Sequence, residues 1–217
     1  NFKIIEDASH AIGGKYKSSP IGNCEYSDIV IFSFHPVKII TTGEGGMAVT
    51  NSQQLADKMS LLRSHGVTRD SQLMTHIPDG DWYYQQIELG FNYRMTDIQA
   101  AIGISQIDRL DQYIEKRHSV AEKYRESLNE CPITSQLQID DAYSAYHLYV
   151  IRVKAPQHKK IFHQLRGNDI GVNLHYIPIY RQPYYEQFGY NKRDYPNTEK
   201  YYSQAISLPI YPTLTSS

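Results

Sequence analysis

Residues 28–34, with the sequence DIVIFSF, form an almost unbroken apolar run of about the length of one β-strand. Such a run is typical of a strand covered on both faces, as in the parallel or mixed sheets of α/β proteins. Residues 2–5 form a second short apolar run, which ends in Glu6 and Asp7. Residues 47–50 follow a glycine-rich turn and give a third. We therefore expect an α/β fold built on a buried sheet.

Helical patterns follow these strands. Residues 51–52 are expected to cap a helix that carries Leu55, Met59 and Leu62 at helical spacing and ends near Gly66. Residues 67–91 are polar and irregular, and a loop of this length in a compact domain is usually functional or disordered.

A second helical stretch is expected to begin at Thr96. Thr96 and Gln99 have the spacing of a capping box, in which the first residue caps the helix and the third residue of the helix bonds back to it. The helical pattern continues to Leu128, so this segment is expected to bridge two domains. Its apolar residues fall on roughly one stripe: Ile98, Ile102, Ile107, Leu110 and Ile114.

The character of the sequence changes after Pro132. Residues 146–153 alternate as a half-buried strand does, residues 157–165 carry a helical stripe, and residues 171–177 again favour a strand. We therefore place a domain boundary near residue 115. Residues 1–115 form part of a larger domain, and residues 116–217 form a smaller α+β domain.

The overall composition excludes several classes of protein. The 217 residues have a formal net charge of −1, which does not predict binding to nucleic acid or to an anionic membrane. Cys24 and Cys131 are the only cysteines, too few for a disulfide framework or a thiolate zinc site, and their use fits a reducing cytoplasm. No apolar stretch approaches the roughly 20 residues that span a bilayer. We expect a cytoplasmic protein without a metal site.

Polar residues that could take part in binding or catalysis follow two of the predicted strands. Asp7 ends the first strand and His10 comes three residues later, whereas Ser33 ends the next strand and Lys38 comes five residues later. Ligands of α/β sheets bind outside the carboxyl ends of the strands, so Asp7, Ser33 and Lys38 are expected to converge on one crevice.

Lys38 differs from the other lysines in its surroundings. It follows a buried strand and has no acidic neighbour in sequence before Glu44. A partly desolvated lysine has a lowered pKa, which makes its amine a nucleophile for a carbonyl. Simpler interpretations stay open: a loop lysine is usually solvated, and Asp7 can merely cap a turn.

Four motifs in order resemble the DegT/DnrJ/EryC1/StrS aminotransferases: EDASHA (6–11), SFHPVK (33–38), GEGG (43–46) and GFNYRMTD (90–97). The resemblance covers nearly the whole chain. It implies a fold-type I architecture that binds pyridoxal 5'-phosphate (PLP) and acts on nucleotide-linked keto sugars. Residues 175–179 (HYIPI) and 182–185 (QPYY) are similar to the branch that makes the pseudaminic acid precursor, in which UDP-4-amino-4,6-dideoxy-N-acetyl-β-L-altrosamine is the aminated product.

The resemblance also assigns roles. Lys38 would bond covalently to the cofactor and, once displaced, would move the proton between carbon centres. Asp7 would pair with the protonated pyridine nitrogen, His10 would contact the ring and its 3-hydroxyl, and Ser33 would bond the phosphate. Asn92 would reach the phosphate of the neighbouring subunit's cofactor, which implies a homodimer with shared active sites. His175 and Tyr176 are further candidates, as residues that line the sugar site, although packing is the simpler interpretation of both.

The activity implied is transfer of an amino group from an amino acid, with L-glutamate as the expected donor, to C4 of a UDP-linked 4-keto-6-deoxy-hexose. The alternatives are a transaminase acting at C3 or on a perosamine-type or aminoarabinose-type sugar, and a catalytically incompetent homologue that acts as a scaffold. A PLP-dependent sugar dehydratase is disfavoured, because those enzymes carry histidine in place of the lysine.

Two expected features of the family are not found in these 217 residues: a Gly-Thr phosphate loop and an aromatic residue stacked on the cofactor ring. We therefore interpret the sequence as a fragment, clipped at the end of its small domain as well. The isolated chain is expected to hold the cofactor poorly.

Overall fold

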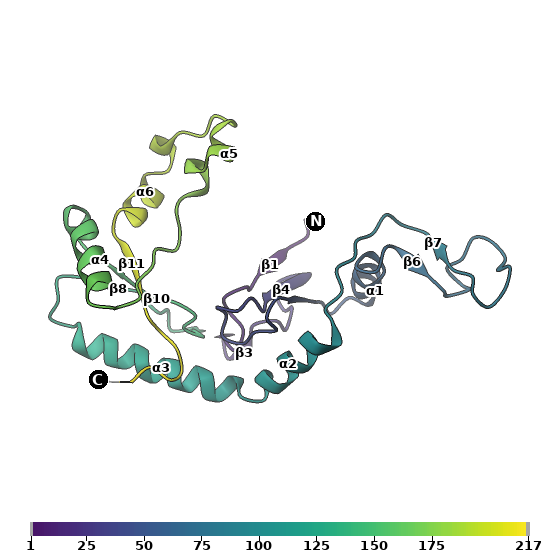
Figure 1. Ribbon diagram of the computed structural model, residues 1–217, viewed down its shortest axis with the longest axis horizontal. Helices are drawn as coiled ribbons and strands as arrows, with labels where there is room; N and C mark the ends of the chain where they lie inside the picture. Colours follow the sequence, from purple (N-terminus) through teal and green to yellow (C-terminus); the bar gives the residue numbers. More distant parts are fainter. Residues whose placement is uncertain (1, 216–217) are drawn as a thin grey trace. The chain divides into compact units, whose positions relative to one another are not determined.

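The computed structural model describes residues 2–215 and divides the chain into two compact units, residues 1–110 and residues 111–217 (Figure 1). The division falls five residues before the boundary expected from the sequence.

A mixed three-stranded sheet, in the order β1-β4-β5, forms the centre of unit 1. β1 (Ile5–Asp7) pairs in parallel with β4 (Ile29–Ser33), and β4 pairs antiparallel with β5 (Gly46–Val49). The α/β class with a mixed sheet, expected from the apolar run at 28–34, is confirmed.

The first strand lies later in the sequence than residues 2–5, where the apolar pattern placed it. The Ile4 N–H donates to the Asp28 carboxylate (2.9 Å) instead of to a strand neighbour. The regular ladder therefore begins only with the pair Ile5 and Ile29, and it continues to the pair Asp7 and Ile31. The strand nevertheless ends at Asp7, as expected.

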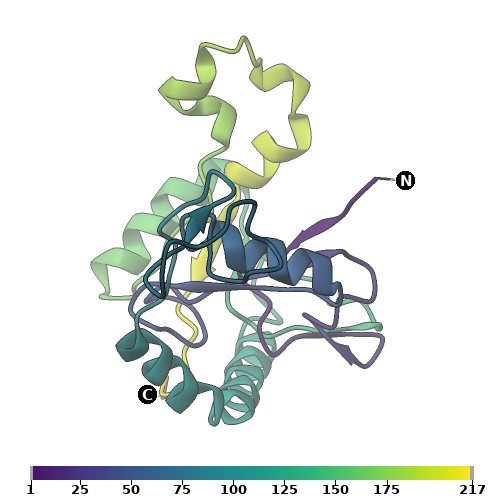
Figure 2. The ribbon, with the colours of Figure 1, turned by 90° about the vertical axis from the view of Figure 1, so that its right-hand side faces the viewer.

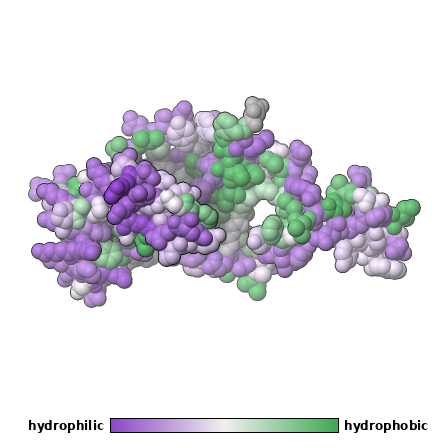
Figure 3. Space-filling view, turned by 90° about the horizontal axis from the view of Figure 1, so that it is seen from above, coloured by the Kyte–Doolittle hydropathy of each residue, from purple (hydrophilic) through white to green (hydrophobic). Residues whose placement is uncertain are grey.

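The two faces of β4 differ in burial. Val30 and Phe32 are 0% and 8% exposed, whereas Ile31 and Ser33 on the opposite face are only partly buried. Hydrophobic surface also lies over the beginning of the chain, where Ile5 is 67% exposed (Figure 3). In the described structure, one face of this sheet is thus closed and the other is more open.

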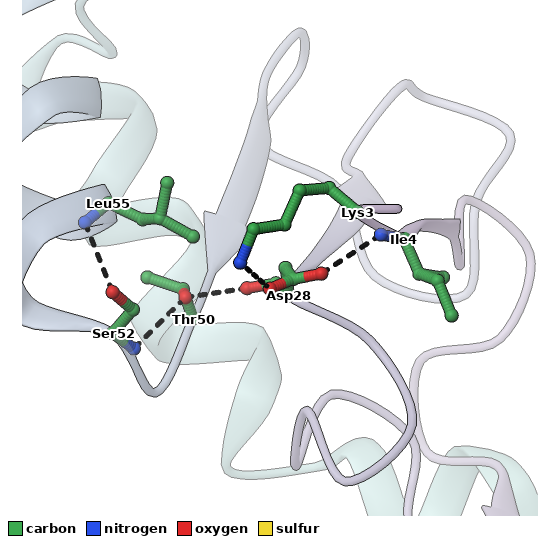
Figure 4. A network of polar contacts seen from close by, with 6 residues as sticks. All are labelled: Lys3, Ile4, Asp28, Thr50, Ser52 and Leu55. Atoms are coloured by element: carbon green, nitrogen blue, oxygen red, sulfur yellow. Dashed lines mark hydrogen bonds and ion pairs between the residues drawn. The ribbon is translucent and has the colours of Figure 1, made fainter. Parts of the chain in front are cut away.

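Polar contacts tie the sheet to the first helix, α1 (Gln53–Leu62). The Asp28 carboxylate also accepts from Lys3 Nζ (2.8 Å), and the Asp28 carbonyl accepts from Thr50 Oγ1 (2.6 Å) (Figure 4). The Ser52 N–H in turn donates to Thr50 Oγ1 (3.1 Å), and Ser52 is the N-cap of α1. The cap predicted at residues 51–52 is therefore confirmed at Ser52, and it aligns α1 with the ends of β4 and β5.

The expected capping box at Thr96 and Gln99 is present and begins α2 (Asp97–Ile107). The helical stretch predicted to run through Leu128 is interrupted, because α2 ends at Ile107 with Asp108 as its C-cap, and α3 begins at Leu110. Within unit 1, the α2 isoleucines are not the packing face. Ile98, for example, is 76% exposed, whereas Gln99, Gly103 and Gln106 are partly buried.

The other elements of unit 1 are short. β6 (Val67–Thr68) and β7 (Gln85–Gln86) form a short hairpin within the region 67–91, which was expected to be irregular. In Figure 1 this hairpin extends away from the central sheet. The remaining short elements are β2 (Lys15–Tyr16) and β3 (Ser19–Pro20).

Unit 2 is built around an antiparallel sheet in the order β11-β10-β8, in which β11 spans Ala205–Leu208 and β8 spans Thr134–Ser135. β10 (Tyr149–Arg152) and α4 (His158–Gly167) lie within or close to the strand and the helix expected at 146–153 and 157–165. Its core is apolar, with Ile206 and Val172 almost completely buried.

The prediction of a strand at residues 171–177 is wrong. Asn173 forms an isolated bridge with Ser207, in which each N–H donates to the other's carbonyl (3.1 and 2.8 Å). The next amide, Leu174 N–H, donates to the Asn173 side chain (2.8 Å), so it does not contribute to a ladder. A local bond from a side chain has replaced the pairing that the alternating pattern favoured.

Arg117 is a buried cation in the core of unit 2. It is 5% exposed, and its guanidinium donates to the backbone carbonyls of Tyr146 (3.0 Å) and Ile210 (2.9 Å). Burial lowers the pKa of Arg117. A guanidinium has several donors in a fixed planar arrangement, which suits it to connect α3 with two segments distant in sequence.

The remaining segment of unit 2, residues 176–202, stands away from the sheet and from α4 (Figures 1 and 2). Among residues 2–215, no helix combines the length and apolar character required to cross a bilayer. The further elements of the unit are α3 (Leu110–Ser127), β9 (Ala142–Tyr143), η1 (Ala155–Gln157), η2 (Ile179–Arg181), α5 (Pro183–Glu186), η3 (Lys192–Asp194) and α6 (Pro196–Tyr202).

Candidate active site

The carboxyl ends of β1 and β4 bring Asp7 and Ser33 onto one face of the sheet. Asp7 is in register with Ile31, and paired residues of neighbouring strands share a face. Ser33 lies two residues beyond Ile31, and side chains alternate along a strand, so Ser33 lies on that face too. This is the more open face of the sheet. The convergence expected for these two residues is therefore reproduced by the strand register.

The Asp7 carboxylate is stabilised in its charged form. Its Oδ1 accepts from the Ser9 N–H (3.0 Å). The pKa of Asp7 is lowered, chiefly by hydrogen bonding from the side chain and backbone of Ser9 and further by the charges of His10 and Lys38; partial desolvation opposes these effects. Asp7 thus carries a fixed negative charge at neutral pH.

Lys38 lies on the loop that follows β4, where its backbone N–H donates to the His35 carbonyl (2.9 Å). Its side chain is partly buried. Burial lowers the pKa of Lys38, and the negative charge of Asp7 acts in the opposite direction. Each of the two groups therefore affects the protonation of the other, which places Asp7 and the Lys38 amine in one electrostatic environment within unit 1.

Hydrogen bonds to the Phe34 backbone close the loop between Lys38 and β5. The Phe34 carbonyl accepts from the Thr42 N–H (3.0 Å) and from Thr41 Oγ1 (2.9 Å), while the Phe34 N–H donates to the Gly45 carbonyl (2.9 Å). Gly46 is required by packing, because a Cβ at this position would lie 2.7 Å from the Phe32 carbonyl oxygen. The GEGG motif therefore lets the loop return closely against the end of β4.

His10 interacts with the group formed by Asp7 and Lys38, whereas Asn92 is held by other contacts. His10 is partly buried, and its charge contributes to the lowered pKa of Asp7. Asn92 lies in the segment that precedes α2 and is exposed. It forms an isolated β-bridge with Ser64, which follows α1. Unit 1 thus brings Asp7, His10, Ser33 and Lys38 together around the ends of β1 and β4, whereas the contacts that hold Asn92 lie in another part of the unit.

His175 and Tyr176 belong to unit 2. The His175 Nδ1 lies 2.8 Å from Ser207 Oγ, and the His175 carbonyl accepts from Tyr201 OH (3.2 Å). Tyr176 is 61% exposed. His175 is therefore anchored to β11 and α6, while Tyr176 is exposed to solvent.

Gln106 is a residue of unit 1 that sequence reasoning missed. Its side chain accepts from the Thr41 N–H (3.2 Å) and donates to the Thr41 carbonyl (3.0 Å), close to Lys38 in the chain. The available signal was the spacing of Gln99, Gly103 and Gln106, which places two amides and a glycine on one side of a helix that is otherwise rich in isoleucine.

The whole chain, residues 1–217, matches the DegT/DnrJ/EryC1/StrS aminotransferase family. The chain belongs to this family. The order of the motifs and the position of the lysine after β4 agree with this membership.

Several curated relatives match almost the whole chain. The spore coat polysaccharide biosynthesis protein SpsC of Bacillus subtilis is 36% identical over 98% of the chain and 56% of the relative. The UDP-4-amino-4,6-dideoxy-N-acetyl-β-L-altrosamine transaminase of Campylobacter jejuni is 37% identical over 97% of the chain and 54% of the relative. The chain thus spans about half the length of the curated relatives it matches.

Solved structures show the same relation. Helicobacter pylori PseC, an aminotransferase involved in pseudoaminic acid biosynthesis, superimposes with a TM-score of 0.88 at 31% identity, over 99% of the chain and 56% of PseC. Spr1654 of Streptococcus pneumoniae, assigned as a sugar aminotransferase, is 28% identical in its PMP-form, with a TM-score of 0.89 over 99% of the chain and 53% of Spr1654. The expected fold, part of a fold-type I aminotransferase, is confirmed.

The residues of unit 1 fit PLP chemically. A protonated pyridine nitrogen requires a carboxylate that stays charged, and the lowered pKa of Asp7 meets this requirement. A lysine that reacts with an aldehyde must lose its proton readily, and burial lowers the pKa of Lys38. The Ser33 hydroxyl, on the same face as Asp7, is of the type that bonds phosphate.

Proposed function

We propose that this chain carries the lysine-bearing part of a PLP-dependent aminotransferase that acts on a nucleotide-linked keto sugar. The observation that carries the proposal is the electrostatic interaction of Asp7, a carboxylate with a lowered pKa on the open face of the sheet, with Lys38, a lysine with a lowered pKa on the loop after β4. Two such groups that influence each other are typical of a functional site.

Each residue has a defined task in this proposal. Bound PLP supplies an electron sink, which makes a proton on the neighbouring carbon removable. Asp7 would hold a proton at the pyridine nitrogen, and Lys38 would hold the cofactor through its Nζ and, once displaced, would serve as the base that moves a proton between carbon centres. Ser33 Oγ bonds the phosphate, and His10 contacts the ring. His175 and Tyr176 line the sugar site.

The substrates proposed are L-glutamate as the amino donor and a UDP-linked 4-keto-6-deoxy-hexose, aminated at C4. Support for the acceptor comes from the altrosamine transaminase of Campylobacter jejuni and from PseC, which match along nearly the whole chain. The match to SpsC supports a place in the synthesis of cell-surface polysaccharides.

The substrate assignment is tested with the full protein and its cofactor. L-Glutamate should change the visible spectrum of the bound cofactor, and a UDP-linked 4-keto-6-deoxy-hexose should then reverse the change and yield the 4-amino sugar. GDP-linked perosamine-type and UDP-linked aminoarabinose-type keto sugars serve as controls, with regiochemistry read by NMR. Amination at C3, or a preference for a control sugar, would replace the proposed substrate, and no spectral response to any amino acid would favour a scaffold.

We also propose a homodimer whose two active sites are shared, with Asn92 reaching the cofactor phosphate of the neighbouring subunit. Lys38→Ala and Asn92→Ala subunits should each be impaired alone. When they are mixed, half of the dimers combine the two variants, and one site in each such dimer has both native residues. Activity should therefore recover to about a quarter of the native value. Size-exclusion chromatography with light scattering gives the oligomeric state, and mixing without recovery would mean that each site takes its Lys38 and its Asn92 from the same subunit.

A further inference from the structure

We propose that Gln106 is a positioning residue for Lys38. The inference rests on the role proposed for Lys38 above. The primary amide of Gln106 forms both possible hydrogen bonds with one backbone unit, Thr41, by accepting from its N–H (3.2 Å) and donating to its carbonyl (3.0 Å). The side chain thus acts on the loop as a neighbouring strand would, although it comes from a helix 65 residues further along the chain.

The chain between Lys38 and Thr41 is buried, which allows it to transmit this constraint. Ile39 and Ile40 are 5% and 2% exposed, so these two residues have little freedom to move. Lys38 is held on its other side by the bond from its N–H to the His35 carbonyl (2.9 Å). A fixed position of Thr41 therefore fixes the backbone from which the Lys38 side chain projects.

The surface of α2 is shaped to receive this loop. One turn before Gln106 lies Gly103, where a Cβ would come within 2.9 Å of Thr42 Cγ2. The Thr42 side chain is 2% exposed, and its Oγ1 donates to the Glu44 carbonyl (2.7 Å). Gly103 lets the loop approach the helix, and Gln106 then bonds it at this distance.

The bonds of Gln106 connect α2 to the loop, not to its own helix, so their loss should act on the loop. A loosened loop would admit water to the Lys38 amine. Burial is the cause of the lowered pKa of Lys38, so added hydration would raise that pKa towards its ordinary value. Less of the amine would then be unprotonated at neutral pH.

The test measures Lys38 directly in the full protein freed of cofactor. The rate of Lys38 acetylation by acetic anhydride is followed against pH by peptide mass spectrometry, with exposed lysines of the same sample as internal standards. For Gln106→Ala we expect the Lys38 profile to move to higher pH, so that labelling near neutral pH falls about threefold or more. Exchange of the Thr41 amide hydrogen should become at least about tenfold faster.

Gln106→Glu provides a second variant of equal size. An ionised carboxylate accepts from the Thr41 N–H but cannot donate to its carbonyl, so the variant should show the same loss near neutral pH. At acidic pH, where the carboxyl is protonated and can donate, Thr41 amide exchange should return towards the native value. The matched control is Gln99→Ala on the same helix, which weakens the capping box and lowers the melting temperature without changing the Lys38 profile.

The outcomes separate this inference from the proposed function. A folded Gln106→Ala or Gln106→Glu protein with a native Lys38 profile and native Thr41 exchange overturns the positioning role, whatever Lys38 does. Equal changes in Gln99→Ala overturn it as well, because they would show a general loosening of α2. Borohydride reduction of the native protein with PLP, followed by peptide mapping, tests Lys38 itself. Attachment at another lysine would overturn the proposed function while the measured effect of Gln106 on Lys38 would stand.

Discussion

Replacing Lys38 by alanine should lower transaminase turnover in the full protein by about three orders of magnitude or more. The variant removes the amine that holds the cofactor covalently and that moves the proton between carbon centres. Because Lys38 lies on a loop and its side chain is only partly buried, the fold should be retained. The measurements are kcat with saturating substrates, the visible spectrum of the bound cofactor and the melting temperature.

Lys38→Arg is the sharper companion variant. A guanidinium preserves the positive charge near Asp7 but is not deprotonated in proteins, so it cannot replace the amine and should be as inactive as alanine. Lys58→Ala is the matched control. That lysine, on α1, forms an ion pair with Glu88, and its loss should leave kcat unchanged. Substantial turnover by Lys38→Ala, or an equal loss in Lys58→Ala, would contradict the assignment of Lys38.

The features of unit 1 that could be predicted well from the sequence are those determined by local chemistry. The capping box at Thr96 and the cap at Ser52 depend on residues within one helical turn, and both are present. The apolar run at 28–34 identified β4, and the convergence of Asp7 with Ser33 follows from the parallel register of adjacent strands. Local rules were sufficient here because each one involves neighbours in the chain or the general geometry of a sheet.

Contacts between distant segments were not accessible in this way. The bond from Gln106 to Thr41 depends on how α2 lies against the loop, which no periodicity encodes. The helical pattern through Leu128 gave no sign of the break before α3, because the residues around Asp108 are all compatible with a helix. The isoleucines of α2 fall on roughly one stripe, but an apolar stripe does not specify which elements cover it.

Asp7→Asn should lower turnover by about 100-fold or more, and it should do so while making Lys38 easier to deprotonate. Asparagine has the size of aspartate, and its oxygen still accepts from the Ser9 N–H, so the turn after β1 is preserved. The change removes the negative charge and replaces one acceptor oxygen by an NH2 donor of nearly the same size. Without that charge the pyridine nitrogen loses the group that keeps it protonated, and the electron sink weakens.

The effect on Lys38 has the opposite sign, which makes the experiment discriminating. The charge of Asp7 raises the pKa of Lys38 and burial lowers it, so removal of the charge leaves burial unopposed and lowers the pKa further. Acetylation of Lys38 near neutral pH should therefore become faster in Asp7→Asn, although turnover falls. If Asp7 served only to tune the lysine, kcat would follow the labelling rate instead.

Asp28→Asn is the control for a lost carboxylate at a strand end. Asp28 precedes β4 and bonds to Lys3 and to the Ile4 N–H, and its pKa is also lowered, chiefly by Lys3. Its replacement should lower the melting temperature by loosening the start of β1 but should leave both kcat and the labelling of Lys38 at native values. A fall in kcat of equal size in the two variants would mean that Asp7 supports the sheet and not the cofactor, whereas slower labelling of Lys38 in Asp7→Asn would show that its charge does not act on that amine.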